Sequence, residues 1–293
     1  MNTDKPERPL LRYHGGKWKL APWIISHFPK HRIYVEPFGG AASILLRKER
    51  SYAEIYNDLD NEIVQLFQIA RDDGETLARK LEMTPFARAE FNEAYHPTTD
   101  PIEACRRTII RSYMGFGSDG VHSTHRTGFR SNSNRSGTTP AHDWMHLPDA
   151  FRQIIIRLQG IVIECRPAIE LLEKYDGPDV LFYLDPPYVH SSRKRVDAGR
   201  GYRHEMTDAD HRQLIAAAKK IRGFVVLSGY PNPIYQKLLA KWHRVEKTGP
   251  LADGALQRTE VLWISPRTWE ALEQNQDLFS ARFATNFATN GNG

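Results

Sequence analysis

The tetrapeptide Asp185-Pro186-Pro187-Tyr188 follows an apolar run, residues 181–184, that is typical of a buried strand. The two prolines have no backbone N–H, so the carbonyl groups here can only accept hydrogen bonds, and the Asp185 carboxylate adds another acceptor. Two acceptors aimed at the N–H bonds of an aromatic amine favour its electron-rich form and stabilise the charge that develops when it attacks a methyl group. Tyr188 can stack on a base swung out of a duplex. The segment therefore indicates methylation of an exocyclic amine.

A second segment, Glu36–Ala41, joins an apolar run to helix-forming residues, and its small side chains let a ligand approach the backbone closely. Asp58 follows about twenty residues later, the spacing at which an acidic residue reaches a nucleotide ribose in doubly wound folds. The glycines lack the Gly-x-Gly-x-x-Gly spacing of a dinucleotide site, and Glu36 would repel a pyrophosphate but can hold a cation. S-adenosylmethionine fits this pattern, because it carries a sulfonium and an ammonium group and no phosphate.

Basic residues are bunched in two polar segments, although the net charge of the whole chain is only +5. Between positions 106 and 135 the sequence has six arginines and a single acid, Asp119. Between positions 189 and 204 five basic residues face only Asp197. Bunching of this kind suits a surface that follows phosphates, and solvated surface loops are the alternative interpretation.

The elements that must position these residues alternate between strands and helices, which predicts a mostly parallel sheet. The candidate strands are Ile33–Val35, Ala53–Asn57, Ile161–Glu164, Val180–Leu184, Phe224–Leu227 and Val261–Ile264. The candidate helices include Ala42–Lys48, Glu62–Arg71, Ala168–Tyr175 and Asp208–Ile221, the last with Thr207 as its N-cap. The pattern predicts a doubly wound α/β fold, whose ligands bind at the carboxyl ends of the strands, where Glu36 and Asp185 lie.

The alternation is interrupted between the second and third candidate strands. Residues 75–114 have apolar side chains at helical spacing, whereas residues 115–140 are rich in Gly, Ser, Thr, Asn and Arg. A long irregular stretch inside a compact chain is usually functional or disordered. We therefore expect an inserted, mainly helical domain that carries an exposed loop or hairpin. The expected units are a cofactor-binding half at 1–65, the insertion at 66–158, a catalytic half at 159–275 and a disordered tail at 276–293.

Composition excludes several other classes of protein. Cys105 and Cys165 have no partner at zinc or redox spacing, so we interpret both as free thiols in a reducing compartment. The first nine residues are polar, and no apolar run approaches the roughly 20 residues of a membrane span. No histidine pair has metal-ligand spacing with a supporting acid. We expect a cytoplasmic protein with no metal and no membrane anchor.

Four motifs occur in the order seen in Dam-type DNA adenine methyltransferases, the alpha group, which the sequence resembles over nearly all of its length outside the ends and the insertion. The motifs are Arg12-Tyr13-His14-Gly15-Gly16-Lys17, Glu36-Pro37-Phe38-Gly39-Gly40, Asp58 and Asp185-Pro186-Pro187-Tyr188, and residues 258–263 resemble the closing strand of the family. The resemblance implies a Rossmann-like methyltransferase sheet with an inserted DNA-recognition domain. It also implies site-specific methyl transfer from S-adenosylmethionine to the 6-amino group of a flipped adenine in duplex DNA.

The resemblance implies a cofactor site made of Tyr13, Lys17, Glu36, Pro37, Phe38, Gly39, Gly40, Ala41, Asp58, Glu164, Cys165 and Asp185. Within it, Glu36 and the loop backbone would cradle the amino acid moiety, and Asp58 would bind the ribose hydroxyls. Glu164 and Cys165 would flank the adenine of the cofactor. Lys17 would lie at the methionine end, near the target base as well.

Residues 111–118 and 126–130 resemble the target-recognition region of the family. Arginine paired bidentately with guanine, or asparagine with adenine, gives base-specific contacts worth about 1–3 kcal/mol each. For any single arginine, contact with a phosphate or with solvent is the more frequent outcome. We expect the basic segment after Tyr188 to order over the flipped adenine when DNA binds. The DNA-binding residues expected are Arg111, Phe116, Arg126, Arg130, Asn132, Arg135, Arg193, Lys194, Arg195, Arg200 and Arg203.

Two alternatives remain at this point. The same amine chemistry would serve a methyltransferase acting on cytosine or on RNA, and a catalytically inactive DNA-binding relative would keep the fold. The ordered motifs and the basic insertion favour adenine in DNA. A cognate restriction endonuclease as partner and a free-standing or phage-borne role are equally compatible with the sequence, and a monomer is the default state of the family.

Overall fold

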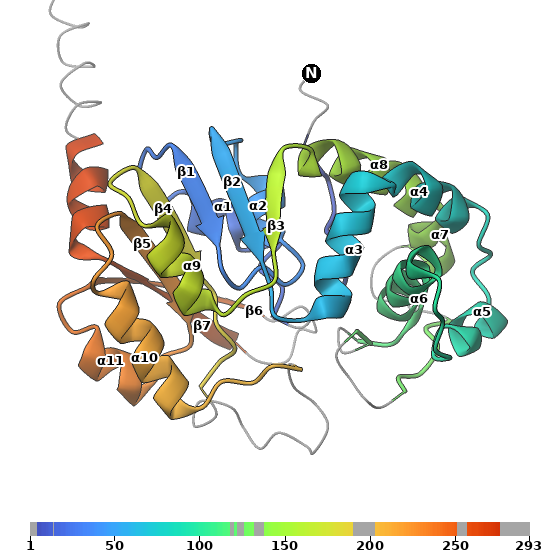
Figure 1. The fold of residues 1–293 in the computed structure, drawn as a ribbon. Helices are drawn as coiled ribbons and strands as arrows, with labels where there is room; N and C mark the ends of the chain where they lie inside the picture. Colours follow the sequence, from blue (N-terminus) through green and yellow to red (C-terminus); the bar gives the residue numbers. More distant parts are fainter. Residues whose placement is uncertain are drawn as a thin grey trace, which may run out of the picture.

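A seven-stranded sheet with the strand order β3-β2-β1-β4-β5-β7-β6 forms the centre of the molecule (Figure 1). The computed structural model describes residues 5–13, 15–117, 120–121, 126–131, 138–189, 203–250 and 257–275. The strands are β1 (Ile33–Glu36), β2 (Ala53–Asn57), β3 (Ile161–Glu164), β4 (Val180–Leu184), β5 (Phe224–Gly229), β6 (His243–Pro250) and β7 (Gln257–Ile264). Strands β1 to β5 pair in parallel, and β7 runs antiparallel to both of its neighbours. The expected doubly wound α/β fold is confirmed.

Two hydrophobic clusters cover the two faces of the sheet, because successive side chains of a strand point to opposite faces. In β4, Leu181 and Tyr183 belong to one cluster, and Phe182 and Leu184 belong to the other. The first cluster includes side chains of α1 (Ala21–Ile25), α2 (Ser43–Arg47) and α3 (Asn61–Asp72). The second includes side chains of α9 (Ala168–Tyr175), α10 (Asp208–Ala218) and α11 (Pro233–Leu238). Strands buried on both faces explain the unbroken apolar runs in the sequence.

The sequence-based boundaries agree closely with these elements. The bounds of β2, β3, β4 and α9 are those expected, and α2 and α3 differ by one residue at each end. Thr207 caps α10 as expected: its hydroxyl accepts the N–H of Asp210, whose carboxylate accepts the N–H of Thr207. The helix ends at Ala218 rather than Ile221. Residues 266–275 form a further helix after β7.

Between β2 and β3, α3 is followed by five more helices, which lie beside the β3 edge of the sheet in Figure 1. They are α4 (Gly74–Glu82), α5 (Arg88–Glu93), α6 (Pro101–Met114), α7 (Pro140–Met145) and α8 (Leu147–Leu158). Their buried side chains, such as Leu77 and Phe151, join the same hydrophobic cluster as one face of the sheet. The helical character of this region agrees with the sequence analysis, while the boundaries at 66 and 158 stay a prediction.

The irregular segment expected at 115–140 is described only in part. An isolated antiparallel bridge joins Gly115 and Phe129, and the N–H of Phe116 donates to the carbonyl oxygen of Gly128 at 2.8 Å. Residues 118–119, 122–125 and 132–137 lie outside the described residues, as does the tail expected at 276–293. Among the residues described, no helix has the length and apolar character that crossing a membrane requires.

Candidate active site

A cavity of about 440 Å³ opens at the carboxyl ends of β1, β2 and β4. Its volume falls within the range of small-molecule sites, roughly 300–1,000 Å³. Of the residues expected to bind cofactor or to act in catalysis, it is lined by Tyr13, Lys17, Glu36, Pro37, Phe38, Gly39, Gly40, Ala41, Asp58, Asp185 and Pro187. The structure thus brings residues of all four sequence motifs, including Asp58, to one place, as parallel strands predict.

The loop after β1 is held in a conformation that exposes its backbone to the cavity. Gly40 has a φ of 47°, and a Cβ atom on it would lie 2.9 Å from the ring of Tyr13. A Cβ atom on Gly39 would overlap the ring of Tyr56. The N–H of Gly40 donates to Oδ2 of Asp58 at 2.8 Å, and the Tyr56 hydroxyl donates to the Gly40 carbonyl oxygen at 2.7 Å. Only glycine fits both positions, which explains the Gly-Gly pair.

Glu36 places a buried carboxyl group in the cavity wall. Its Oε2 accepts hydrogen bonds from the Tyr34 hydroxyl at 2.8 Å and from the N–H of Leu45 at 3.0 Å. Burial raises the pKa of Glu36 to about 8, against the lowering effect of these two donors. A cation in the cavity would favour the ionised form. The group therefore suits a positively charged ligand.

Asp58 turns both carboxylate oxygens toward the backbone. Oδ2 accepts the N–H of Gly40 and Oδ1 accepts the N–H of Asp60, each at 2.8 Å. Burial raises the pKa of Asp58, while these two donors lower it. Each carboxylate oxygen can accept more than one hydrogen bond, so capacity remains for ligand hydroxyl groups.

Asp185 lies beside Ser228 because the parallel register of β4 and β5 aligns Leu184 with Leu227. Its Oδ1 accepts hydrogen bonds from Lys17 Nζ at 3.0 Å and from Ser228 Oγ at 2.8 Å. Within the described part of the chain, Oδ2 receives no hydrogen bond, and the side chain lines the cavity. One oxygen is thus fixed by the protein, and the other can accept a hydrogen bond from a ligand.

Lys17 is a buried cation, with only 4% of its surface exposed. Its Nζ contacts the carbonyl oxygen of Gly15 at 3.2 Å, Asp185 and the Tyr188 hydroxyl. Burial alone would lower its pKa, but the carboxylates of Asp185 and Glu260 raise the pKa well above the ordinary value. Lys17 is therefore protonated throughout the physiological pH range.

Tyr188 packs against an aromatic partner that the sequence analysis did not single out. Its ring stacks on Tyr230, with centroids 4.1 Å apart and planes 25° from parallel, and it is 8% exposed. Tyr230 and Ser228 both belong to the end of β5 or follow it, beside β4. Polar and aromatic residues at the end of the next strand were the signal that could have identified them. Stacking of Tyr188 on a base stays a prediction.

Glu164 and Cys165 do not line the cavity. Oε1 of Glu164 accepts hydrogen bonds from Lys174 Nζ at 2.6 Å and from the Tyr175 hydroxyl at 2.8 Å, and Cys165 is exposed. The residues after β3 that do line the cavity are Pro167, Ala168 and Ile169. The expected contact of Glu164 and Cys165 with a cofactor adenine remains a prediction.

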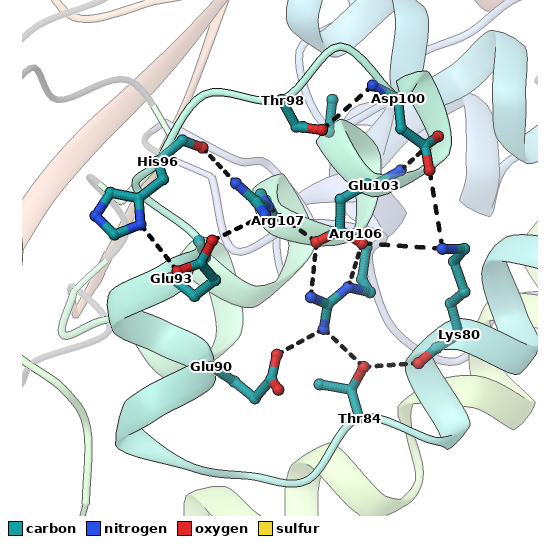
Figure 2. Close-up of polar contacts among 12 residues, drawn as sticks. Lys80, Thr84, Glu90, Glu93, His96, Thr98, Asp100, Glu103, Arg106 and Arg107 are labelled. Atoms are coloured by element: carbon teal, nitrogen blue, oxygen red, sulfur yellow. Dashed lines mark hydrogen bonds and ion pairs between the residues drawn. The ribbon is translucent and has the colours of Figure 1, made fainter.

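The arginines of α6 are paired with glutamates from inside and outside the helix (Figure 2). Arg106 contacts Glu90 at 2.8 Å and Glu103 at 2.7 Å, and Arg107 contacts Glu103 at 2.9 Å and Glu93 at 3.1 Å. Hydrogen bonds from Arg106 and Arg107 lower the pKa of Glu103 to about 2. The charge count for positions 106–135 does not include these glutamates, because they precede position 106.

Two of the arginines expected to bind DNA, Arg111 and Arg130, also lie near acidic residues of the protein. Arg111 forms an ion pair with Glu62 and donates to the Ala94 carbonyl oxygen at 2.8 Å. Arg130 has 11% of its side chain exposed, and its Nη1 lies 3.8 Å from Asp143. These contacts account for Arg111 without any ligand, whereas the buried Nη1 of Arg130 has no hydrogen-bond partner among the described residues.

Arg126, Phe116 and Arg203 are more accessible. Arg126 contacts Asn92 in an exposed position, Phe116 is 72% exposed, and Arg203 lines the cavity while pairing with acidic residues of α3 and its N-cap. The other residues expected to bind DNA, Asn132, Arg135, Arg193, Lys194, Arg195 and Arg200, lie outside the described residues. Their role stays a prediction.

The fold and the cavity define an α/β protein with a ligand site at the carboxyl edge of its sheet. The model of the D12 class N6 adenine-specific DNA methyltransferases matches residues 13–248, so the chain belongs to that family. Among the described residues, no group of three or more His, Cys, Asp or Glu side chains could hold a metal ion.

Several curated relatives carry the name DNA adenine methylase. The one from Escherichia coli K12 is 27% identical over 196 residues, which is 63% of this chain and 66% of that protein, slightly under two thirds of its length. The one from Haemophilus influenzae is 26% identical over 277 residues, 87% of this chain and 91% of that protein. Modification methylase StsI from Streptococcus sanguinis is 21% identical over 223 residues, 69% of this chain and 32% of that protein.

Proposed function

We propose that this protein transfers a methyl group from S-adenosylmethionine to the 6-amino group of adenine in DNA. The proposal depends mainly on the geometry of Asp185. Its Oδ1 is fixed by Lys17 and Ser228, while its other carboxylate oxygen is free to accept a hydrogen bond from a ligand in a cavity of cofactor size. Membership of an adenine-specific family supports the choice of base.

The residues around the cavity fit S-adenosylmethionine. Glu36 is a buried carboxyl group whose raised pKa a cationic amino group would bring down, and Asp58 has acceptor capacity for ribose hydroxyls. The Gly39-Gly40 backbone would lie against the amino acid moiety. When bound, the cofactor supplies an electrophilic methyl group on a sulfonium.

The residues of the tetrapeptide would orient the amine that attacks this methyl group. Oδ2 of Asp185 would accept one N–H of the amine, and a carbonyl oxygen of the Pro186-Pro187 segment would accept the other. Lys17 and Ser228 hold Asp185 in place, so its oxygen need not reorganise during the reaction. An adenine inside a duplex cannot reach this site, so the base must leave the stack, and Tyr188 would support it there.

Double-stranded DNA is the partner that this proposal requires. We assign its recognition to the inserted helical region, with the boundaries 66–158, because that region carries Arg126 and the exposed Phe116. The basic segment at 189–204 would follow the phosphates next to the flipped base.

A tritium-transfer assay with labelled cofactor and duplex DNA, followed by nucleoside analysis, tests the proposal. We expect the label in N6-methyladenine, and Asp185→Ala should lower the rate by at least about 100-fold, because it removes a preorganised acceptor. Asp149→Ala is the matched control, since the Asp149 side chain is 84% exposed on α8 and should leave the rate unchanged. Label in methylcytosine, or only with RNA, would overturn the choice of substrate.

A further inference from the structure

We propose that Glu260 is a positioning residue for the reaction. Its carboxylate balances part of the positive charge of Lys17, so that Asp185 keeps a net negative charge toward the target amine. The inference rests on the proposed methyl transfer and deepens it. Glu260 belongs to the closing strand of the sheet, and neither its sequence motif nor the cavity lining gave it a role.

The geometry places one cation between two carboxylates. Lys17 Nζ lies 3.0 Å from Asp185 Oδ1 and 3.7 Å from Glu260 Oε1. Glu260 is 5% exposed, and its buried Oε1 has no hydrogen-bond partner within normal distance in the described structure. The contact with Lys17 is therefore a charge interaction rather than a close hydrogen bond, and Asp185 is the nearer partner.

The topology of the sheet explains why Glu260 reaches Lys17. Strand β7 pairs antiparallel with β5, and Val261 is aligned with Gly229 at the end of β5. Glu260 thus lies next to the strand end that carries Ser228, which itself contacts Asp185. The ends of β4 and β5 and the adjoining interior part of β7 supply the carboxylates around Lys17 and the Ser228 hydroxyl.

One ammonium group and two carboxylates leave this buried cluster with a net charge of −1 when all three are ionised. Without the Glu260 charge, Asp185 would balance Lys17 alone, and the cluster would be neutral. During transfer the amine nitrogen forms the new C–N bond, the C–S bond breaks with its electron pair left on sulfur, and the nitrogen becomes positive until its extra proton leaves to water. A negative cluster stabilises that charge more than a neutral one does.

The charge of Glu260 is sensitive to pH near neutrality. Burial raises its pKa to about 7, Lys17 lowers it and Asp185 raises it, while Tyr188 also faces the group. On the neighbouring strand β6, Lys247 is aligned with Glu260, and its Nζ lies 5.7 Å from the centroid of the Trp23 ring. Protonation of Glu260 as the pH falls through neutrality would make the cluster neutral and slow the reaction.

The test is the single-turnover rate of methyl transfer, measured with saturating cofactor and DNA from about pH 6 to about pH 9, because this rate reports the chemical step alone. For the wild-type protein we expect the rate to fall as the pH is lowered through neutrality. For Glu260→Gln we expect a rate about 10- to 100-fold lower at the alkaline end, as for loss of one electrostatic contribution, and no fall at acid pH. The KM for DNA should change less than about twofold, because the interaction acts on the transition state.

Two further variants keep the inference open to refutation if Glu260→Gln fails to fold. Glu260→Asp retains the charge, so it should keep most of the wild-type rate and should also show the fall in rate at acid pH. Glu246→Gln changes a carboxylate on β6 that is 44% exposed, so its rate and profile should match the wild type. The inference would be overturned if the rate of Glu260→Gln still fell at acid pH, or if the rate of Glu260→Asp did not. Absence of methyl transfer in the wild type would instead overturn the proposed function.

Discussion

Glu36 is a carboxyl group that the fold buries at a cost. It is 2% exposed and receives two hydrogen bonds, from Tyr34 and Leu45, yet burial keeps its pKa at about 8. At neutral pH it is therefore mostly protonated when nothing cationic is near. A bound ammonium group favours the carboxylate, so binding at neutral pH must release a proton.

The affinity for S-adenosylmethionine should consequently rise with pH up to about pH 8, because fewer protons then have to be displaced. Calorimetry at pH 7 in two buffers of different ionisation enthalpy should detect net proton release on binding. Glu36→Gln should bind at least about tenfold more weakly, the loss expected for a charged partner, and should release less proton. Glu75→Gln, on an exposed face of α4, is the control. Equal proton release by wild type and Glu36→Gln would contradict this role.

At the residue scale, the position of a site residue could be predicted from the sequence where it depends only on the strand that carries the residue. Glu36 is the last residue of β1 and Asp185 directly follows β4, so their position at the carboxyl edge followed from the pattern alone. Tyr230 and Glu260 depend on which strands are neighbours, and the order β4-β5-β7 is a tertiary fact. No local pattern reports it.

At the scale of elements, a buried ion cluster joins the last inserted helix to the sheet. Arg157 of α8 contacts Glu54 of β2 at 2.6 and 2.9 Å and donates to the Leu45 carbonyl oxygen at 2.6 Å. Lys48 contacts Glu54 at 2.6 Å. Burial alone would raise the pKa of Glu54, but hydrogen bonds and charges from Arg157 and Lys48 lower it.

Removing one partner of this cluster should destabilise the protein strongly. Arg157→Met should lower the free energy of unfolding by about 3–5 kcal/mol, because Glu54 loses two buried, charged hydrogen bonds and the Leu45 carbonyl oxygen loses its donor. Arg152→Met is the matched control on the same helix, where the side chain is 34% exposed, and should cost only about 0–1 kcal/mol. Urea unfolding at pH 7 measures the free energy of unfolding of both variants. Equal losses would contradict a stabilising role for the buried ion cluster.

The same cluster should make stability depend on acid pH. The folded-state pKa of Glu54 is depressed, so its contribution is present above the unfolded value of about 4.3 and is lost as the pH falls through the folded value. Arg157→Met should therefore lose less stability than the wild type over that acid range. A parallel decline of both proteins would count against Glu54 as the titrating group.

Elements were predictable where hydrophobic burial sets their pattern. Strand β4 is buried on both faces and was recognised from its apolar run. Strand β6 was missed, because an edge strand pairs on one side only and its sequence, from His243 to Pro250, is mostly polar. Its alignment with β7 decides its conformation, and that long-range pairing leaves no periodic signal.

At the scale of the whole molecule, a chain of polar contacts links the cavity loop to the inserted helices. The N–H of Gly40 and the N–H of Asp60 both donate to Asp58, and Arg203 contacts Asp60 at 2.7 Å and Glu62 at 2.8 Å. Glu62 also accepts from Arg111 and from Thr108 of α6. Glu62 thus belongs to the cofactor half in sequence, while its partners come from the insertion and from the segment before α10. The sequence could not predict these contacts, since Arg203 is 141 positions from Glu62.

This arrangement predicts that Glu62 carries energetic coupling between cofactor and DNA binding. If the wild type binds S-adenosylmethionine more tightly with duplex DNA present, by a factor in the usual range of about 5–150, Glu62→Gln should bring that factor close to one. Glu93→Gln is the control, because Glu93 pairs with Arg107 on the same insertion but contacts nothing at the cavity.

Cofactor dissociation constants with and without DNA, measured for all three proteins, give the coupling directly, and linkage requires the DNA affinity to change by the same factor. A Glu62→Gln variant that lost affinity for each ligand but kept the ratio would show that Glu62 supports both sites separately. The other possible result is a Glu62→Gln variant that binds each ligand alone as tightly as the wild type, while DNA no longer changes its affinity for the cofactor. Only coupling explains that result, because the charge of Glu62 then matters only when both ligands are bound.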